Sequence, residues 1–449
     1  MEEIYDVLIS GGGVTGTGLA WTLTRFTNVT RVALIERRHA VAQVNSNVMS
    51  NAQTLHRGPQ ETNYPLAKAI KVNRGAALLS AYLERHAPDA CKQVQKMVIG
   101  VGDEEVRMLE RRYAEFKPHF PDLRLLRRDE IEALEPNVIR GRDPKTAIAA
   151  LYDEKGFAVN YQRVAESLLH EAAGAGKTLD AIFNREIESI TRGADGIFTV
   201  KTNRGDLRAR TVAVCAGGSS LNFAHAMGFG REFSLLAVAG SFYTAKNLLK
   251  GKVYTVQDPA IPFAEVHGDP AVHDPSETRF GPTAKPLPMV ERHRWSTVGE
   301  FVRSGALRLA AIWSLIRILM HSRIARFALK NFLYEVPFLG KFLFLRSARK
   351  VVPSLRYRDL KLARGEGGIR SQLVDTRKRA LAKGMDKIIG EGIIFTMAPS
   401  PGASYCLGNA VEDTEVLIRH LGPDYAFDRN ALDDHLFGVD VDVGSEVRS

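Results

Sequence analysis

The sequence has few cysteines, and they lie far apart. Only Cys91, Cys215 and Cys406 occur in 449 residues, and no two of them form a CxxC pair. So few thiols exclude a disulfide-framework protein and a four-thiolate zinc or iron–sulfur site, and they favour a reducing compartment. The first ten residues, MEEIYDVLIS, are acidic where a secretory signal is basic. We therefore expect a protein whose bulk lies in the cytosol.

Long uncharged apolar runs are also absent. The most apolar stretch, residues 295–350, is interrupted by arginine and lysine before it reaches the roughly 18 residues that a spanning helix requires. Its ten basic and two acidic side chains give a net charge of +8, against +10 for the whole chain. This pattern predicts helices that lie on an anionic membrane surface without crossing it. Apolar helices that pack on a core with their arginine tips in water are the alternative.

The remaining composition is that of a globular protein. Hydrophobic residues make up 45% and charged residues 25% of the chain, without internal repeats or low-complexity segments. A disordered or collagen-like chain is therefore excluded, and the length predicts two or three domains.

The first 36 residues carry the clearest local pattern. Residues 5–10 predict a buried strand, residues 11–16 (GGGVTG) a tight turn, residues 17–26 a helix and residues 32–35 a second strand. This is a βαβ unit with GxGxxG at its first turn, which is typical of dinucleotide binding.

Each glycine of that turn has its own role. Gly11 permits the sharp turn, Gly13 lets the backbone approach a pyrophosphate, and Gly16 allows close packing of helix on strand. The N-terminus of the helix faces the phosphates, and Glu36 is placed to accept hydrogen bonds from a ribose. Because no second copy has this context, we expect one bound dinucleotide.

The other elements of a nucleotide-binding domain are scattered along the chain. We predict a helix within 156–176, strands at 198–202 and 211–215, a strand at 392–396, and a helix from about 405 to 421. The fold class is therefore α/β: a Rossmann-like domain from residues 1–90, 151–230 and 361–449. Residues 91–150 and 231–360 would form a second domain with a mixed sheet, carrying the helical, membrane-facing segment 295–350.

Longer blocks of the sequence resemble a known family. They are NSNVMSNAQTLHRGPQETNY (45–64), KMVIGVGDEE (96–105), LEPNVIRG (134–141), VAGSFY (238–243), GKVYTVQDPAIPFAEVHGDP (251–270), TRFGPTA (278–284) and TMAPSPGASYCLGNA (396–410). Through these blocks the chain is similar to the glutathione-reductase-type flavoproteins of the D-amino-acid-oxidase branch and, within it, to the malate:quinone oxidoreductases, particularly their shorter form. Residues 290–350 match least well.

The resemblance implies an enzyme at the cytoplasmic face of the membrane. It would oxidise malate to oxaloacetate with FAD and pass the electrons to a membrane quinone, as part of the tricarboxylic acid cycle. The residues expected to contact FAD are Gly11, Gly13, Val14, Thr15, Gly16, Glu36, Arg37, Ser50, Asn51, Ala216, Gly217, Ser400, Gly402, Ala403 and Ser404.

Oxidation of a 2-hydroxy acid requires a cation for its carboxylate. Arg370, in GGIRSQL, is similar to the arginine that holds a carboxylate over the flavin in this branch, although an arginine after two glycines also suits a surface loop. Arg279 and Thr283 are candidates for the second carboxylate of malate. Gln53 and Thr54 are candidates for contact with substrate or flavin.

Two histidines compete for the role of base. His56 lies in NAQTLHRG and His267 in AEVHGDP, and a neutral imidazole suits proton abstraction at neutral pH. We favour His267 slightly, because its block carries more of the malate-specific likeness. The run HGDPAVHD fits no recognised metal motif, so we expect no metal.

Two other functions remain open at this point. One is the FAD-dependent oxidation of another 2-hydroxy acid, such as 2-hydroxyglutarate, or of an amino acid, because one arginine clamp serves them all. The other is nucleic-acid binding by the basic segment, although its charges alternate with Leu, Ile and Phe and no RNA-binding motif is present.

Overall fold

The N-terminal unit folds as its sequence predicts. In the computed structural model, which describes residues 3–259, 261, 265–336, 338–382, 384, 387–397 and 401–438, strand β1 (Ile4–Ser10) is followed by helix α1 (Val14–Phe26) and strand β2 (Arg31–Ile35). Gly11 has φ of +106°, and a Cβ on Gly16 would lie 2.0 Å from the carbonyl oxygen of Gly11. Only glycine fits both positions, and this fixes the tight turn.

The first sheet contains this unit at its centre. Among the described residues it has eight strands, of which β20, β9, β1, β2 and β6 are parallel neighbours in that order. β19 pairs antiparallel with β20, and β7 and β8 extend from β9 as an antiparallel meander. The bounds are β6 Thr178–Ile182, β7 Ile187–Arg192, β8 Phe198–Thr202, β9 Gly205–Val214, β19 Lys387–Gly390 and β20 Ile393–Thr396. The strands predicted at 198–202, 211–215 and 392–396 are confirmed.

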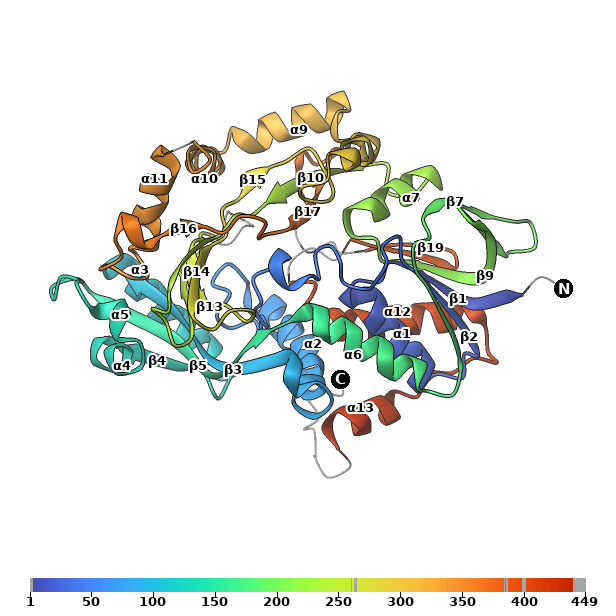
Figure 1. The fold of residues 1–449 in the computed structure, drawn as a ribbon, viewed down its shortest axis with the longest axis horizontal. Helices are drawn as coiled ribbons and strands as arrows, with labels where there is room; N and C mark the ends of the chain where they lie inside the picture. Colours follow the sequence, from blue (N-terminus) through green and yellow to red (C-terminus); the bar gives the residue numbers. More distant parts are fainter. Residues whose placement is uncertain are drawn as a thin grey trace.

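Helices cover both faces of this sheet (Figure 1). On one face α1 packs against α6 and α12, whose apolar sides join the core that includes Trp21. On the other face α7 packs with the β7–β9 meander. The bounds are α2 Leu66–Arg85, α6 Tyr161–Ala173, α7 Ser220–Ala226, α12 Cys406–Leu421 and α13 Arg429–Phe437. The helices predicted within 156–176 and from 405 to 421 are confirmed.

A second, mixed sheet forms the other half of the molecule. Its described strands run in the order β16-β11-β14-β13-β12-β3-β5-β4, with β12 and β3 parallel and the other pairs antiparallel. The bounds are β3 Cys91–Val101, β4 Arg124–Arg127, β5 Ile148–Val159, β11 Tyr243–Lys246, β12 Lys252–Thr255, β13 His267–Pro270, β14 Glu277–Gly281 and β16 Lys361–Leu362. Three helices follow β3 and β4: α3 Asp103–Phe116, α4 Arg128–Leu134 and α5 Pro136–Ile139.

A small antiparallel sheet connects the two halves. Its order is β15-β10-β17-β18, with bounds β10 Phe233–Ala239, β15 Lys285–Pro286, β17 Ile369–Asp375 and β18 Ala380–Leu381. β17, which lies in the predicted nucleotide-binding domain, pairs with β10 from the other predicted domain, and β5 runs across the predicted boundary at 150. The division into two domains therefore stays a prediction.

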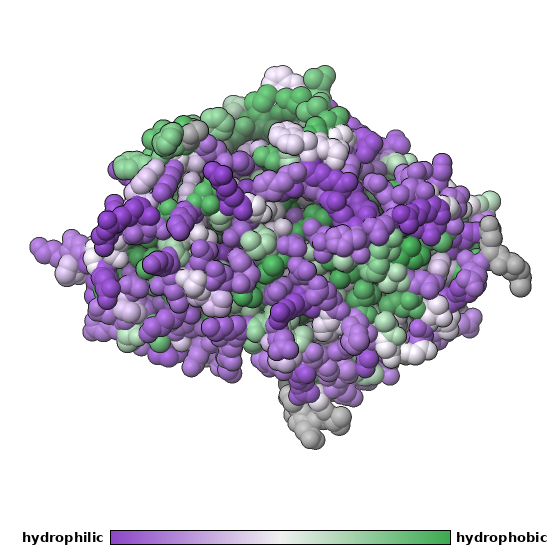
Figure 2. All heavy atoms as spheres, in the orientation of Figure 1, coloured by the Kyte–Doolittle hydropathy of each residue, from purple (hydrophilic) through white to green (hydrophobic). Residues whose placement is uncertain are grey.

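The segment 295–350 is helical. It begins with the short helix η4 (Trp295–Thr297), α8 (Val298–Phe301) and the π-helical turn η5 (Val302–Ala306), and continues with α9 (Leu309–Leu319), α10 (Ser322–Leu333) and α11 (Leu339–Ala348). Figure 1 shows α9, α10 and α11 in a row along the top of the molecule, and Figure 2 shows that apolar residues dominate this edge. Among the described residues, no helix is long and apolar enough to cross a bilayer. The remaining short helices are η1 Val48–Ser50, η2 Pro88–Ala90, η3 Gly217–Ser219 and η6 Tyr357–Asp359.

Candidate active site

A cavity of about 630 Å³ lies over the glycine-rich turn, at the carboxyl ends of the parallel strands β1, β2 and β9. Gly13 is the N-cap of α1 and has no side chain to block the helix N-terminus. A Cβ on Gly217, which follows β9, would meet nothing within 4 Å, so the backbone there is open to the cavity. Backbone N–H groups and an open helix N-terminus suit a pyrophosphate.

Two charged residues, Glu36 and Arg37, directly follow strand β2 and line this cavity. Glu36 accepts hydrogen bonds from the backbone N–H of Gly12 and of Arg38, both at 2.8 Å, which fix its carboxylate in the cavity wall. Arg37 forms ion pairs with Glu291 and with Glu300, the latter at 2.9 Å. The carboxylate keeps lone pairs for ribose hydroxyls, whereas the arginine is held by the protein.

A second cavity, of about 440 Å³, continues from the first. The two cavities share Asn45, Met397 and Ala403 in their linings. Together they form one space, with one end over the glycine-rich turn at the N-terminus of α1 and the other between the second and small sheets. This shape suits a dinucleotide whose reactive ring lies in the second cavity.

His56 lines the second cavity and is held by a buried carboxylate. Its Nδ1 lies 2.7 Å from Oε1 of Glu61, and the same oxygen accepts a hydrogen bond from Nζ of Lys96 at 2.5 Å. Burial alone would raise the pKa of Glu61, but the charge of Lys96 and the hydrogen bond from His56 hold it well below its usual range. Since a carboxylate only accepts, His56 carries its proton on Nδ1 and a lone pair on Nε2.

His267 lines the same cavity in a different environment. Its ring stacks on Tyr254 with centroids 4.0 Å apart, its Nδ1 lies 3.3 Å from the carbonyl oxygen of Glu265, and its buried Nε2 has no hydrogen-bond partner among the described residues. Burial lowers the pKa of His267 to about 3, although the charge of Asp269 opposes this. Burial also lowers the pKa of His56, against the effect of Glu61. Both rings are therefore neutral at neutral pH.

Cations lie on two walls of the cavity. Arg370 comes from β17, and burial lowers its pKa, but a guanidinium stays charged at any physiological pH. Lys68 and Lys71 come from the first turns of α2, and Nζ of Lys68 lies 3.9 Å from the ring centre of Tyr64. The cavity therefore presents positive charge to an acidic ligand.

The comparisons with known proteins agree with this architecture. The family described as FAD dependent oxidoreductase matches residues 6–408. A probable malate:quinone oxidoreductase of Campylobacter jejuni is 39% identical over 95% of this chain and 98% of its own length. The malate:quinone oxidoreductase of Helicobacter pylori strain 26695 is 36% identical over 96% of this chain and 97% of its own.

The chain belongs to the malate:quinone oxidoreductases, within the FAD-dependent oxidoreductases. Solved structures support the fold. L-α-glycerophosphate oxidase from Mycoplasma pneumoniae aligns with a TM-score of 0.65 at 19% identity, over 92% of this chain and 95% of that one. Glycine oxidase from Geobacillus kaustophilus also gives 0.65, at 18% identity, over 95% of this chain and 97% of that one.

The structure gathers most of the residues expected of a malate:quinone oxidoreductase around the two cavities. Those in the lining of the first are Gly11, Gly13, Val14, Thr15, Glu36, Arg37, Ala216, Gly217 and Ala403. Those in the lining of the second are Ser50, Asn51, Gln53, Thr54, His56, His267, Thr283, Arg370, Gly402, Ala403 and Ser404. Gly16 lines neither cavity, because it packs α1 against the turn. Ser400 lies outside the described residues.

Arg279 is placed differently from the expectation. It is fully buried and does not line the cavity; its guanidinium donates to the carbonyl oxygen of Asn51 at 2.9 Å and pairs with Glu366 at 3.3 Å. Glu366 and Asp269 hold the Arg279 side chain in place. Arg279 therefore supports the cavity wall formed by residues 50–53. The amide of Gln53 is likewise engaged by Val48, Val272 and His273.

Sequence reasoning missed Glu61, Lys96, Tyr254 and Lys68. Glu61 follows His56 by five residues, and an acid so near a candidate base was a usable signal. Lys96 gave no such signal, because it reaches Glu61 only through the pairing of β3 in the second sheet.

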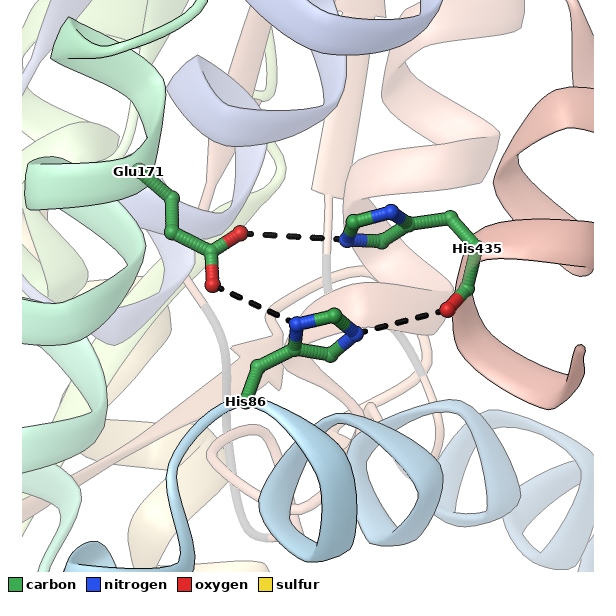
Figure 3. A group of neighbouring side chains, drawn as sticks. All are labelled: His86, Glu171 and His435. Atoms are coloured by element: carbon green, nitrogen blue, oxygen red, sulfur yellow. Dashed lines mark hydrogen bonds and ion pairs between the residues drawn. The ribbon is translucent and has the colours of Figure 1, made fainter.

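A cluster of two histidines and a glutamate lies away from both cavities (Figure 3). Glu171 faces His86 at 3.6 Å and His435 at 3.8 Å, and Trp21 donates to its carboxylate at 2.9 Å. These residue types also bind metals, but the two imidazole planes are within 13° of parallel, so their in-plane lone pairs do not converge on one point. We interpret the group as a tether of α13 to α2 and α6.

Proposed function

We propose that this chain oxidises (S)-malate to oxaloacetate, with FAD as its cofactor and a membrane quinone as the electron acceptor. The observation that carries the proposal is the His56–Glu61–Lys96 chain in a cationic cavity that is continuous with a dinucleotide cavity. When bound, FAD accepts the hydride from C2 of malate and supplies two electrons to the quinone.

The residues present fit FAD. The open N-terminus of α1 and the backbone around Gly217 would hold the pyrophosphate, and Glu36 would hold the adenosine ribose. Residues 401–404, ahead of α12, line the second cavity on the side where the flavin ring would lie. The N-terminus of α12 adds positive potential there, which favours the reduced ring.

The two carboxylates of malate require two positive contacts. Arg370 would hold the carboxylate next to the reacting carbon, because a guanidinium grips a carboxylate with two parallel hydrogen bonds. Lys68, which lines the cavity from α2, replaces Arg279 as our candidate for the distal carboxylate, since Arg279 is enclosed by Glu366 and Asp269. Arg279 would act as a support for the wall.

His56 is the better candidate for the base. The Nε2 lone pair would take the hydroxyl proton of malate, and the Glu61 carboxylate would stabilise the imidazolium that results. His267 has a pKa lowered from 6.5 to about 3, which makes proton uptake about three orders of magnitude less favourable. We therefore propose that His56, and not His267, is the base, and that His267 hydrogen-bonds the substrate.

The quinone is dissolved in a lipid bilayer, so the enzyme must contact the bilayer surface. The helices of 295–350 carry apolar side chains that are exposed in the structure: Trp295, Val302, Leu307, Leu309, Ile312, Trp313, Ile316, Leu319, Met320, Leu329, Phe332, Phe338, Leu339 and Phe342. A patch of this kind marks an interaction surface, and the basic side chains around it favour anionic lipid by about 1 kcal/mol each. We propose peripheral attachment to the cytoplasmic face.

Anaerobic bleaching of the flavin tests the reaction. Malate should reduce the bound flavin of the purified protein faster than 2-hydroxyglutarate or amino acids do. Faster bleaching by 2-hydroxyglutarate would refute the substrate assignment. Pelleting with anionic liposomes, in parallel with an RNA gel shift over a salt series, tests the surface, and retention of RNA without lipid would refute membrane attachment.

A further inference from the structure

The second cavity opens to the surface beside the apolar helices. Away from its junction with the first cavity, the exposed lining residues are Lys71, Pro259 and Gly384. Asp258, next to Pro259, pairs with Arg323 of α10 at 3.4 Å. Gly384 follows β18, which packs against α9. Two sides of the mouth are thus attached to the helices that form the exposed apolar surface.

One wall of the cavity is apolar and belongs to the same helices. Val238, Ile261 and Ala284 line the cavity and form one buried cluster with Phe327 of α10. The backbone N–H of Ala284 donates to Oδ1 of Asn331, one turn further along α10, at 2.7 Å. α10 therefore forms the back of the cavity wall.

The outer side of α10 is apolar as well. Leu329 is 59% exposed and Phe332 is 69% exposed, on the same helix whose Phe327 and Asn331 are buried. Besides the hydrogen bond of Asn331, α10 makes ion pairs through Lys330 with Glu265 and through Arg323 with Asp258, and Glu335, just after the helix, pairs with Lys285. Apolar side chains are thus continuous from the external surface through one helix to the cavity.

The apolar wall offers no polar contact to malate. A dianion of four carbons needs donors and cations, which the cavity supplies through Arg370, Lys68 and the histidines. Arg370 on β17 is the cross-strand neighbour of Val238 on β10, so the polar and apolar parts of the lining meet there. An aromatic-sized ring with a long hydrocarbon tail gains about 25 cal/mol for each Å² of apolar surface that it buries. The apolar wall and the mouth beside α10 therefore suit a ligand that has such a ring and tail.

We infer that a lipid-soluble quinone binds in this mouth, with its ring against Val238, Ile261 and Ala284 and its tail along α10 toward the bilayer. The inference rests on the proposed function and identifies where its second substrate binds. There the quinone takes up two electrons from the reduced cofactor and two protons, and leaves as the quinol along the same route.

Phe327 offers a test that leaves the polar walls unchanged. Phe327→Glu places a carboxylate behind the apolar wall, and Phe327→Leu keeps the wall apolar. Ile389→Glu, on β19 of the first sheet, puts the same charge on a 51% exposed apolar residue as a matched control. The two half-reactions are measured separately: flavin bleaching by malate, and flavin reoxidation by a long-tailed quinone in liposomes.

We expect Phe327→Glu to slow reoxidation at least tenfold while bleaching by malate stays within twofold, and Phe327→Leu and Ile389→Glu to behave like the unchanged protein. Equal reoxidation in all variants would overturn the site. Slowing of both half-reactions together in Phe327→Glu would also overturn it. Absence of bleaching in the unchanged protein would instead refute the proposed function.

Photolabelling of the unchanged holoenzyme gives a readout that needs no variant and no turnover. An azido-quinone with a polyprenyl tail, added in anionic liposomes, should label β10, residues 258, 259 or 261, residues 282–286 or α10, and unlabelled quinone should suppress this labelling. Label that is confined to other segments, or that unlabelled quinone leaves unchanged, would overturn the inference even if Phe327→Glu fails to retain FAD.

Discussion

Glu61→Gln separates the chemical role of the carboxylate from its structural role. The amide keeps the shape of the side chain but removes the negative charge that faces both His56 and the 2% exposed Lys96. Without that charge the imidazolium formed on proton uptake is no longer stabilised, and the amide no longer fixes the proton on Nδ1. We expect the rate of flavin bleaching by malate to fall by about 10² to 10⁴, the range that general acid–base catalysis spans.

The same change leaves Lys96 buried without its counter-charge. Breaking a buried ion pair on one side costs about 3–5 kcal/mol, so the free energy of unfolding should fall by a similar amount. Lys96→Met in the Glu61→Gln background removes the unpaired charge and should restore most of the stability. It should not restore the rate.

The assay is stopped-flow bleaching across pH, together with urea unfolding of each variant. Glu61 raises the pKa of His56 against the effect of burial, so its loss should move the acid limb of the rate profile to lower pH while the plateau falls. A double variant that recovers both stability and rate would refute the role of Glu61. So would a single variant whose plateau stays within twofold.

Three further changes probe the substrate clamp, a buried histidine and the helix tether. Arg370→Met should raise the KM for malate in bleaching titrations by about 10²-fold or more, since a charged hydrogen bond contributes about 1.5–3 kcal/mol and the pair is bidentate, whereas an unchanged KM would exclude this role. The pKa of His267 is about 3 in the folded protein and near 6.5 in the unfolded chain, so the unfolded chain binds the proton more tightly. The free energy of unfolding should therefore fall as the pH drops from about 6.5 toward 3, by on the order of 1 kcal/mol per pH unit. His267→Gln should flatten that slope in urea unfolding. Glu171→Ala leaves the buried indole N–H of Trp21 without its acceptor and should cost about 1–3 kcal/mol by the same method, with unchanged malate bleaching; no loss of stability would contradict the tether.

The parts of the site that the sequence predicted are set by local chemistry. Gly11 and Gly16 are required by backbone geometry that a Cβ would block, and Glu36 follows its strand within the same βαβ unit. Because these residues act on their neighbours in the sequence, the sequence alone is enough to recognise them.

The buried charges could not be predicted in this way. Lys96 and Lys252 lie directly opposite one another on the parallel strands β3 and β12, which are far apart in the sequence. Each is neutralised by a different acid, Glu61 for Lys96 and Asp269 for Lys252 at 2.7 Å. Nothing in the local pattern of either strand distinguishes such a lysine from one that points to solvent. Only the register of the second sheet decides it.

The burial of Lys96 and Lys252 side by side requires a reason other than stability. A buried ion pair is often no more stabilising than apolar residues of similar volume, because desolvation offsets the attraction. Val or Leu at 96 and 252 would suit a strand interior better, so stability alone does not account for two adjacent buried lysines. Their positive charge keeps Glu61 and Asp269 ionised beside His56 and His267, which line the cavity. The second sheet therefore carries these charges for the chemistry of the cavity. Lys96→Met combined with Glu61→Gln should accordingly give a stable protein whose rate of flavin bleaching stays as low as in Glu61→Gln alone.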